Sequence, residues 1–256
     1  MILRSITKHV KHQNWLALFL DFVIVVVGVF VGLQVQEWAQ EKARQNNEIH
    51  YLNRLHTEVQ ELIKTRNHYD TSRPTYVQHI SESIAILSDE SNNLELNQIQ
   101  CDAIVASSFT TVPPADLPTV NELISAGRLN QIQSPSIRQA ILDFTQQAER
   151  AETLILAMSD TNIELANNHP DLIKLQYTVK SGIEDSVWLD PICDTTAMRK
   201  NPSFMNKFNH NAYIYKVYAD RAVRPVAQHL AELHAEVDKS LGTKHASSSN
   251  DKEVTP

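Results

Sequence analysis

The chain has 256 residues, of which 42% are hydrophobic, 21% are charged and only 5 are glycine. Few glycines and many helix-forming residues favour an all-α fold and disfavour a β-sandwich or barrel, which would need many glycine and proline turns. The net charge of −7 comes with no block of basic residues, so we expect no nucleic-acid partner.

The most hydrophobic stretch lies near the N-terminus, from Leu16 to Val35. A helix of about twenty residues matches the thickness of the hydrocarbon core of a bilayer. Trp15 and Trp38 flank the stretch, as interfacial aromatic residues do. The stretch is longer than the apolar region of a signal peptide, and no small-x-small cleavage site follows it. We therefore expect an uncleaved transmembrane signal anchor at residues 14–36.

Basic residues on the two sides of this anchor differ slightly in number. Three precede it and two follow it closely: Arg4, Lys8 and Lys11, then Lys42 and Arg44. The bias predicts a short cytoplasmic N-terminus at residues 1–13 and a domain at residues 37–241 on the other side, which is the periplasm in a Gram-negative bacterium. The polar segment at residues 242–256 has no apolar face and is predicted to be disordered.

Two features of the anchor point to roles beyond insertion into the membrane. Gly28 and Gly32 form a GxxxG pattern, which lets two membrane helices approach closely and indicates a homodimer, although chance glycine pairs are common in such helices. Asp21 lies shallow in the cytoplasmic leaflet. It either pairs with a polar neighbour at the interface or relays protons or ions.

Beyond Trp38, a stripe of apolar residues spaced by three and four predicts a helix that packs inside a bundle: Ile49, Leu52, Leu55, Val59, Leu62 and Ile63. His56 falls within this stripe, where a hydrogen-bonded core histidine is more expected than a metal ligand. No helix breaker appears before Pro74. We expect a further helical segment from Thr75 to Ser88.

The next helix is predicted from the spacing of Leu96, Ile99, Ala103 and Ala106, and it would bury Cys101 or its neighbour. The proline-rich sequence TTVPPADLP after it indicates a loop. A capping box from Thr119 to Glu122 then predicts the start of a short helix that ends at Gly127.

The clearest helical pattern begins at Ser134, an expected N-cap followed by a proline at the first helical position. Apolar residues continue at alternating steps of four and three to Leu165, so we expect a helix of about thirty residues that ends before Pro170. Asn162 is the single polar residue in this series. It either sets the register of packing or lies in solvent at the helix end.

Residues 169–197 lack periodicity and are expected to be irregular, with Cys193 among them. If the domain is exported, Cys101 and Cys193 would form a disulfide that closes a loop of about ninety residues and adds roughly 3–5 kcal/mol of stability. The alternative is two unpaired cysteines in the core.

The last helix begins with Asn201 as N-cap and Pro202 at its first position, and Pro225 would kink or interrupt it. The long amphipathic segments with short connections together predict an antiparallel helical bundle that follows the transmembrane helix.

Catalytic and metal-binding motifs are weak. His229, Glu232 and Glu236 share one helix face, but no second inward Glu-x-x-His motif accompanies them, so a solvated charged face is the preferred interpretation. No nucleophile signature or glycine-rich phosphate loop is present. We expect no enzyme, no metal and no cofactor.

The N-terminal sequence HVKHQNWLALFLDFVIVVVGVFVGLQVQEW, followed by EIHYLNRLHTEV, resembles an uncharacterised family of proteobacterial single-pass membrane proteins, and TVNELISAGRLNQIQSPSIRQAILDF resembles the middle of that family. The resemblance implies a location in the bacterial inner membrane. It supplies no catalytic residues.

Three functional hypotheses follow. The first is a non-catalytic interaction, scaffold or sensor module that is anchored in the lipid bilayer, dimerises through the anchor and contacts an unknown membrane or periplasmic protein. The second is an accessory subunit of a proton- or ion-coupled complex that uses Asp21. This layout resembles the subunits of flagellar stators, whose α/β periplasmic domains the sequence does not share. The third is a small-molecule-binding bundle with a cavity near Tyr213, Tyr215 and Tyr218.

Overall fold

The computed structural model describes residues 15–89, 93–179 and 187–243, without the side chains of residues 15–18, 177–179 and 187–189. The predicted cytoplasmic residues 1–13 and most of the predicted disordered tail lie outside the described residues. The chain divides into two units, Met1–Tyr51 and Leu52–Pro256. The first helix, α2 (Trp15–Ser88), contributes to both units, and every other described element belongs to the second.

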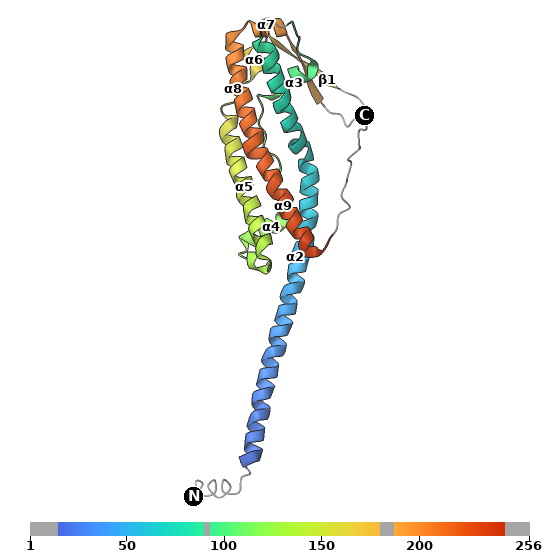
Figure 1. The fold of residues 1–256 in the computed structure, drawn as a ribbon, viewed down its shortest axis with the longest axis vertical. Coiled ribbons are helices and arrows are strands. Elements are labelled where there is room, and N and C mark those ends of the chain that lie inside the picture. The colour runs from blue at the N-terminus through green and yellow to red at the C-terminus, as the bar shows by residue number, and fades with distance from the viewer. Residues whose placement is uncertain (1–14, 90–92, 180–186, 244–256) are drawn as a thin grey trace, which may run out of the picture. The chain divides into compact units, whose positions relative to one another are not determined.

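The described chain is mostly helical, with two strands, which confirms the predicted all-α class (Figure 1). After α2 come α3 (Gln98–Ala106), α4 (Pro118–Ser125), η2 (Leu129–Gln131), α5 (Pro135–Ser159), α6 (Leu165–Asn168), β1 (Ile173–Val179), β2 (Val187–Cys193), α7 (Thr195–Arg199), α8 (Pro202–Tyr218), the π-helical η3 (Ala219–Val223) and α9 (Arg224–Leu241).

The core of the second unit lies between α2, α5, α8 and α9. In Figure 1, α5 lies alongside α9. The η3 segment contacts both helices. Large side chains from all four helices are almost fully buried, among them Leu55, Phe144, Phe204, Phe208, Tyr215 and Leu233. The apolar stripes predicted from the sequence therefore face one another.

Pro74 lies inside α2, which corrects the expected helix boundary. A proline within a helix removes one backbone hydrogen bond and costs about 3 kcal/mol. Arg66 before it and Ile80 after it are both buried in the second unit. Packing on either side of the proline therefore outweighs its local cost.

Helix α5 begins as predicted, because Ser134 Oγ accepts a hydrogen bond from the amide of Ile137. It ends at Ser159, however, so the expected helix of about thirty residues is wrong at its C-terminal end. The completely buried side chain of Asn211 in α8 accepts from the amide of Ile163 at 3.1 Å and donates to its carbonyl at 2.7 Å. These bonds satisfy backbone groups that a longer helix would have paired internally.

The predicted capping box at the start of α4 is also wrong. The N-cap residue is Leu117, and its side chain forms no cap. Instead the Glu58 carboxylate in α2 accepts from the backbone amide and the hydroxyl of Thr119, while Glu122 pairs with Arg54 at 2.9 Å. A distant carboxylate thus replaces the local cap.

The C-terminal end of α4 follows the prediction. Gly127 has a φ of +64°, a conformation that favours glycine. The amide of the next residue, Arg128, donates to the carbonyl of Leu123 at 2.7 Å, which is the bond expected of a glycine-terminated helix.

The region expected to be irregular contains an antiparallel hairpin in which Ile173 pairs with Cys193. β2 contacts α3, where Cys101 is buried, and the structure joins Cys101 to Cys193 in a disulfide with a Cα–Cα distance of 5.8 Å. Both strands have seven residues, but Pro191 within β2 argues against a strand when the sequence is considered alone. The buried face of α3 also differs from the expectation, since Ile99 is 55% exposed.

The C-terminal helix starts as predicted, with Asn201 Oδ1 accepting from the amide of Phe204 at 3.0 Å. An interruption near Pro225 is also confirmed, because the π-helical η3 ends at Val223, two residues before the proline, and divides α8 from α9. A proline lacks the amide that a regular α-helical turn needs at this position.

Candidate functional site

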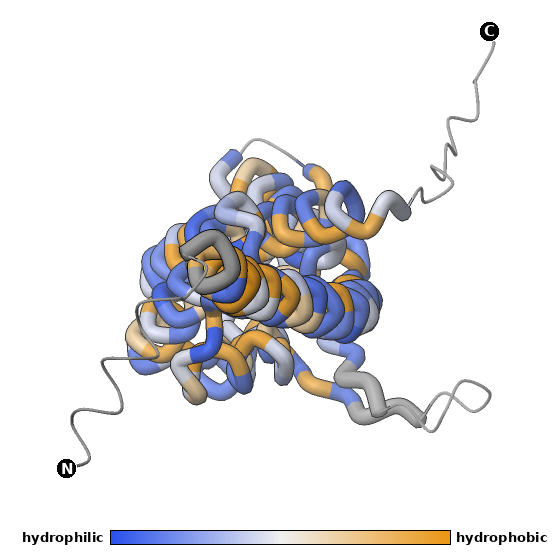
Figure 2. The backbone as a smooth tube through the Cα atoms, turned by 90° about the horizontal axis from the view of Figure 1, so that it is seen from below, coloured by the Kyte–Doolittle hydropathy of each residue, from blue (hydrophilic) through white to orange (hydrophobic). Residues whose placement is uncertain are grey.

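The first unit carries one long exposed apolar surface. Among the described residues, one helix is long and apolar enough to cross a membrane, and none of its most apolar window is buried. Most large apolar side chains between Phe19 and Val35 are 36% to 66% exposed (Figure 2 shows the hydropathy of each residue). Soluble proteins rarely expose so extended an apolar surface. This segment is therefore the candidate membrane span.

The residues singled out in this span lie on its surface. Asp21 is exposed, and no atom lies within 4 Å of a side-chain carbon placed at Gly28 or Gly32. Trp38 is 66% exposed, and Lys42 Nζ lies 5.2 Å from the centre of its ring. Trp15 is helical, but its side chain lies outside the described residues.

The second unit contains a partly open cavity of about 400 Å³. Its walls come from α2, the proline-rich loop, α4, α5, η3 and α9. Apolar side chains dominate the interior, including Val120, Phe144, Ile155 and Val226. A cavity of this size with one buried charged group is typical of a small-molecule site.

Arg66 supplies that charge, and its side chain is 1% exposed. Its Nη1 donates to the carbonyl of Pro114 at 2.7 Å, and its Nη2 donates to Asp70 at 3.0 Å. Burial raises the pKa of Asp70 above its usual range, and the neighbouring Arg66 opposes that shift. Within the described part of the chain, Arg66 Nε is buried without a hydrogen-bond partner. A buried donor without an acceptor is costly, so it marks Arg66 as an unusual residue of the core.

The entrance of the cavity carries the opposite charge. Asp116, Glu149 and Glu152 line it and are exposed. The Asp116 carboxylate accepts from the side chain of Asn121, which also lines the cavity, at 2.6 Å. A ligand that enters meets carboxylates first and the guanidinium of Arg66 deeper inside.

Arg66 was missed in the sequence, although a signal for it was present. It continues the series Leu52, Leu55, Val59 and Leu62 at the same alternating spacing. A charged residue in the buried stripe of a helix needs a partner or a function.

The predicted tyrosine cavity does not match the structure. Tyr213 is 67% exposed, whereas Tyr215 and Tyr218 are buried and their rings meet edge to face at 5.5 Å. Burial raises the pKa of Tyr215, an effect that nearby Arg73 opposes. None of the three tyrosines lines the Arg66 cavity. Tyr215 and Tyr218 are packing residues of the core.

The side chains of the weak histidine motif on α9 are engaged in separate interactions. His229 pairs with Glu232 at 2.9 Å, and Glu236 accepts from Ser136 Oγ at 2.6 Å. The described residues instead bring together His56, His234 and Asp238. The spacing of four between His234 and Asp238 could have indicated this group, but its third member lies on α2.

Comparison of the chain with protein-family models, curated proteins and solved structures finds no match. The resemblance to a proteobacterial membrane-protein family therefore stays a prediction.

Proposed function

We propose that this protein is a non-catalytic, single-pass inner-membrane protein whose helical bundle binds a small molecule in the Arg66 cavity and acts as a sensor or interaction module. The observation that carries the proposal is the buried guanidinium of Arg66 in the wall of the cavity, with its Nε left without a partner among the described residues.

The charges define the class of ligand. The positive charge of Arg66 in the cavity wall favours a carboxylate or carbonyl oxygen, and the carboxylates of Asp116, Glu149 and Glu152 attract a positive group at the entrance. The apolar walls accommodate a side chain between them. A zwitterion of the size of an amino acid or a short peptide satisfies all three conditions.

Ligand binding can be tested on the full-length protein in detergent. We expect amino acids or dipeptides that fit the site to raise its melting temperature, because a ligand that binds only the folded state stabilises it. Ala148→Phe, which fills the cavity, should abolish the shift. Ala157→Phe changes an exposed position of the same helix and should preserve it. A shift that survives Ala148→Phe would place the ligand elsewhere, and no shift with any probe would exclude this ligand class.

The bundle faces the periplasm in this proposal, and residues 1–13 face the cytoplasm. The slight excess of basic residues before the span supports this orientation, as does the disulfide, which belongs in an oxidising compartment. An alkaline phosphatase fusion after Thr243 should be active in a Gram-negative host. An inactive fusion with a normal protein level would reverse the orientation.

The span is proposed to mediate homodimerisation. The surface at Gly28 and Gly32 is open in the single chain and would allow close backbone approach by a second copy. Gly28→Ile and Gly32→Ile should reduce crosslinking between copies in intact membranes, whereas Val31→Ile should not. Equal crosslinking in all variants would exclude this contact face.

The alternative is an accessory subunit of a proton- or ion-coupled complex. It is favoured by the position of Asp21, the one charged side chain between Leu16 and Val35. Crosslinking in intact membranes with identification of copurified proteins separates the two ideas. Loss of a membrane partner in Asp21→Asn supports the alternative. The same partners for wild type and variant, with equal membrane insertion, argue against it.

A further inference from the structure

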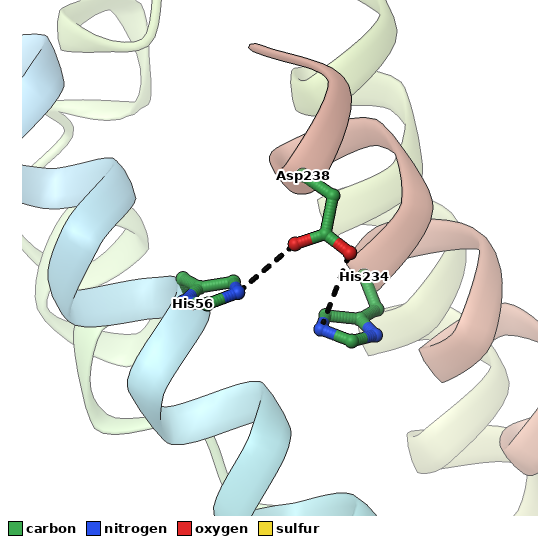
Figure 3. A group of neighbouring side chains, drawn as sticks. All are labelled: His56, His234 and Asp238. Atoms are coloured by element: carbon green, nitrogen blue, oxygen red, sulfur yellow. Dashed lines mark ion pairs between the residues drawn. The ribbon is translucent and has the colours of Figure 1, made fainter. Parts of the chain in front are cut away.

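Two helices of the second unit place imidazole and carboxylate groups against one another (Figure 3). His56 projects from α2, and His234 and Asp238 project from successive turns of α9. Their nearest ligand-type atoms all lie within 4.8 Å of one another. Two residues on one helix and one on its neighbour form a natural clamp between helices.

The carboxylate of Asp238 lies at the centre of the group. One of its oxygens is 2.9 Å from His56 Nε2, and the other is 3.5 Å from His234 Nε2. The two imidazole rings stack at a centroid distance of 5.5 Å. Figure 3 shows both rings turned toward the carboxylate. All three donors thus converge on one small volume.

The partial burial of the three side chains is also suitable for a bound ion. The side chains of His56, His234 and Asp238 are 16%, 22% and 17% exposed, so they are partly desolvated but still reachable from solvent. In a tetrahedral site with bonds of about 2.0–2.2 Å, neighbouring ligand atoms lie roughly 3.3 Å apart. The two histidine–carboxylate distances, 2.9 and 3.5 Å, lie on either side of this value, and all ligand atoms lie within 4.8 Å of one another, so side-chain rotations would be needed to bring them to one ion.

We propose that His56, His234 and Asp238 bind one divalent transition-metal ion of the zinc type. Two imidazole nitrogens and one carboxylate oxygen form a ligand set that zinc accepts, and they leave a fourth position for water. The ion would replace the direct contact between His56 and Asp238, and both histidines would bind it in their neutral form.

The bound ion would join α2 to α9 and stabilise the bundle. None of the three ligands lines the Arg66 cavity, so the site is independent of the proposed small-molecule function. A metal that binds only the folded bundle would raise its melting temperature.

Cobalt and zinc can test the site in the full-length protein, purified in detergent after treatment with a chelator. We expect Co²⁺ to bind at one equivalent with the visible absorption of a four-coordinate ion, and Zn²⁺ to displace it. His56→Ala and His234→Ala should each weaken binding at least about tenfold, because even loss of a group supporting a metal ligand has an effect of that size. Zn²⁺ should raise the melting temperature of the wild type and not that of either variant.

His229→Ala is the matched control, since His229 lies on α9 and pairs with Glu232 outside the cluster. It should bind Co²⁺ as the wild type does. Circular dichroism verifies that each variant is folded, and His56→Gln and His234→Gln replace any alanine variant that is not. Equal affinity in the wild type and both ligand variants, or no binding near one equivalent, would overturn the proposal.

Discussion

The Glu58 carboxylate in α2 bonds Thr119 twice at the N-terminus of α4, through the backbone amide at 2.8 Å and through the hydroxyl at 2.6 Å. It satisfies a donor that the start of a helix leaves unpaired, and its negative charge suits the positive end of the helix dipole. α4 and the adjacent loop form part of the Arg66 cavity, so this contact also shapes the candidate site.

Glu58→Ala should destabilise the protein by about 1–3 kcal/mol, because two partly buried donors lose their acceptor. Hydrogen exchange should accelerate most at residues 118–125. The comparison is Glu61→Ala, which removes an exposed carboxylate of the same helix. Thermal unfolding measures both variants. An equal change in the free energy of unfolding in both variants would show that the Glu58 contact contributes no net stability.

Asn211→Ala should destabilise the bundle by about 1–3 kcal/mol. The variant leaves the amide and carbonyl of Ile163 without the bonds that end α5. Exchange of the amide at residue 163 should become faster. Asn209→Ala, an exposed position on α8, provides the baseline. A fully protected amide in Asn211→Ala would mean that the turn after α5 has another origin.

Reduction of the disulfide should destabilise the folded protein by about 4–5 kcal/mol at most, since it frees a loop of 92 residues in the unfolded chain. Dithiothreitol should lower the melting temperature of the wild type. The double variant Cys101→Ser/Cys193→Ser should melt at the lower temperature with or without it. A wild type that is insensitive to reductant after complete reduction, verified by thiol titration, would contradict this expectation.

His169 should make stability depend on pH. Its burial and the nearby Lys207 hold its pKa below the ordinary value of 6.5, with Asp171 opposing. Its ring also meets Phe204 edge to face at 5.5 Å. The unfolded chain therefore takes up a proton more readily, and stability falls as the pH drops below about 6.5.

Between pH 7 and pH 5, His169→Gln should lose less stability than the wild type in thermal unfolding, because glutamine does not titrate. His68→Gln alters an exposed histidine of α2 and should retain the wild-type slope. If stability depends on pH with the same slope in the wild type and in His169→Gln, His169 is not the cause of the pH dependence.

Features that depend on neighbouring residues were predictable. The caps at Ser134 and Asn201, and the end of α4 at Gly127, each arise from bonds within a few residues. The apolar segment after Trp15 needs only composition and length. The two partners of each of these bonds lie within a few residues of one another in the sequence, which explains why these predictions were correct.

Features that join distant residues were not predictable in the same way. The sequence suggested a capping box at Thr119, but the cap comes from Glu58, which lies 61 residues away. α5 stops early because Asn211 bonds Ile163. The residues next to each partner in the sequence do not indicate such a contact, so only the packed helices reveal it.

The sequence alone determined the all-α class, an apolar segment able to span a membrane and several helix ends, because periodicity, length and capping act locally. The tertiary structure decided how the candidate sites are assembled. Arg66 becomes a cavity residue only when the proline-rich loop and α5 close around it, and His56 meets His234 and Asp238 only when α2 packs against α9. Sites of this kind depend on which helix faces meet, and spacing along one helix does not specify that.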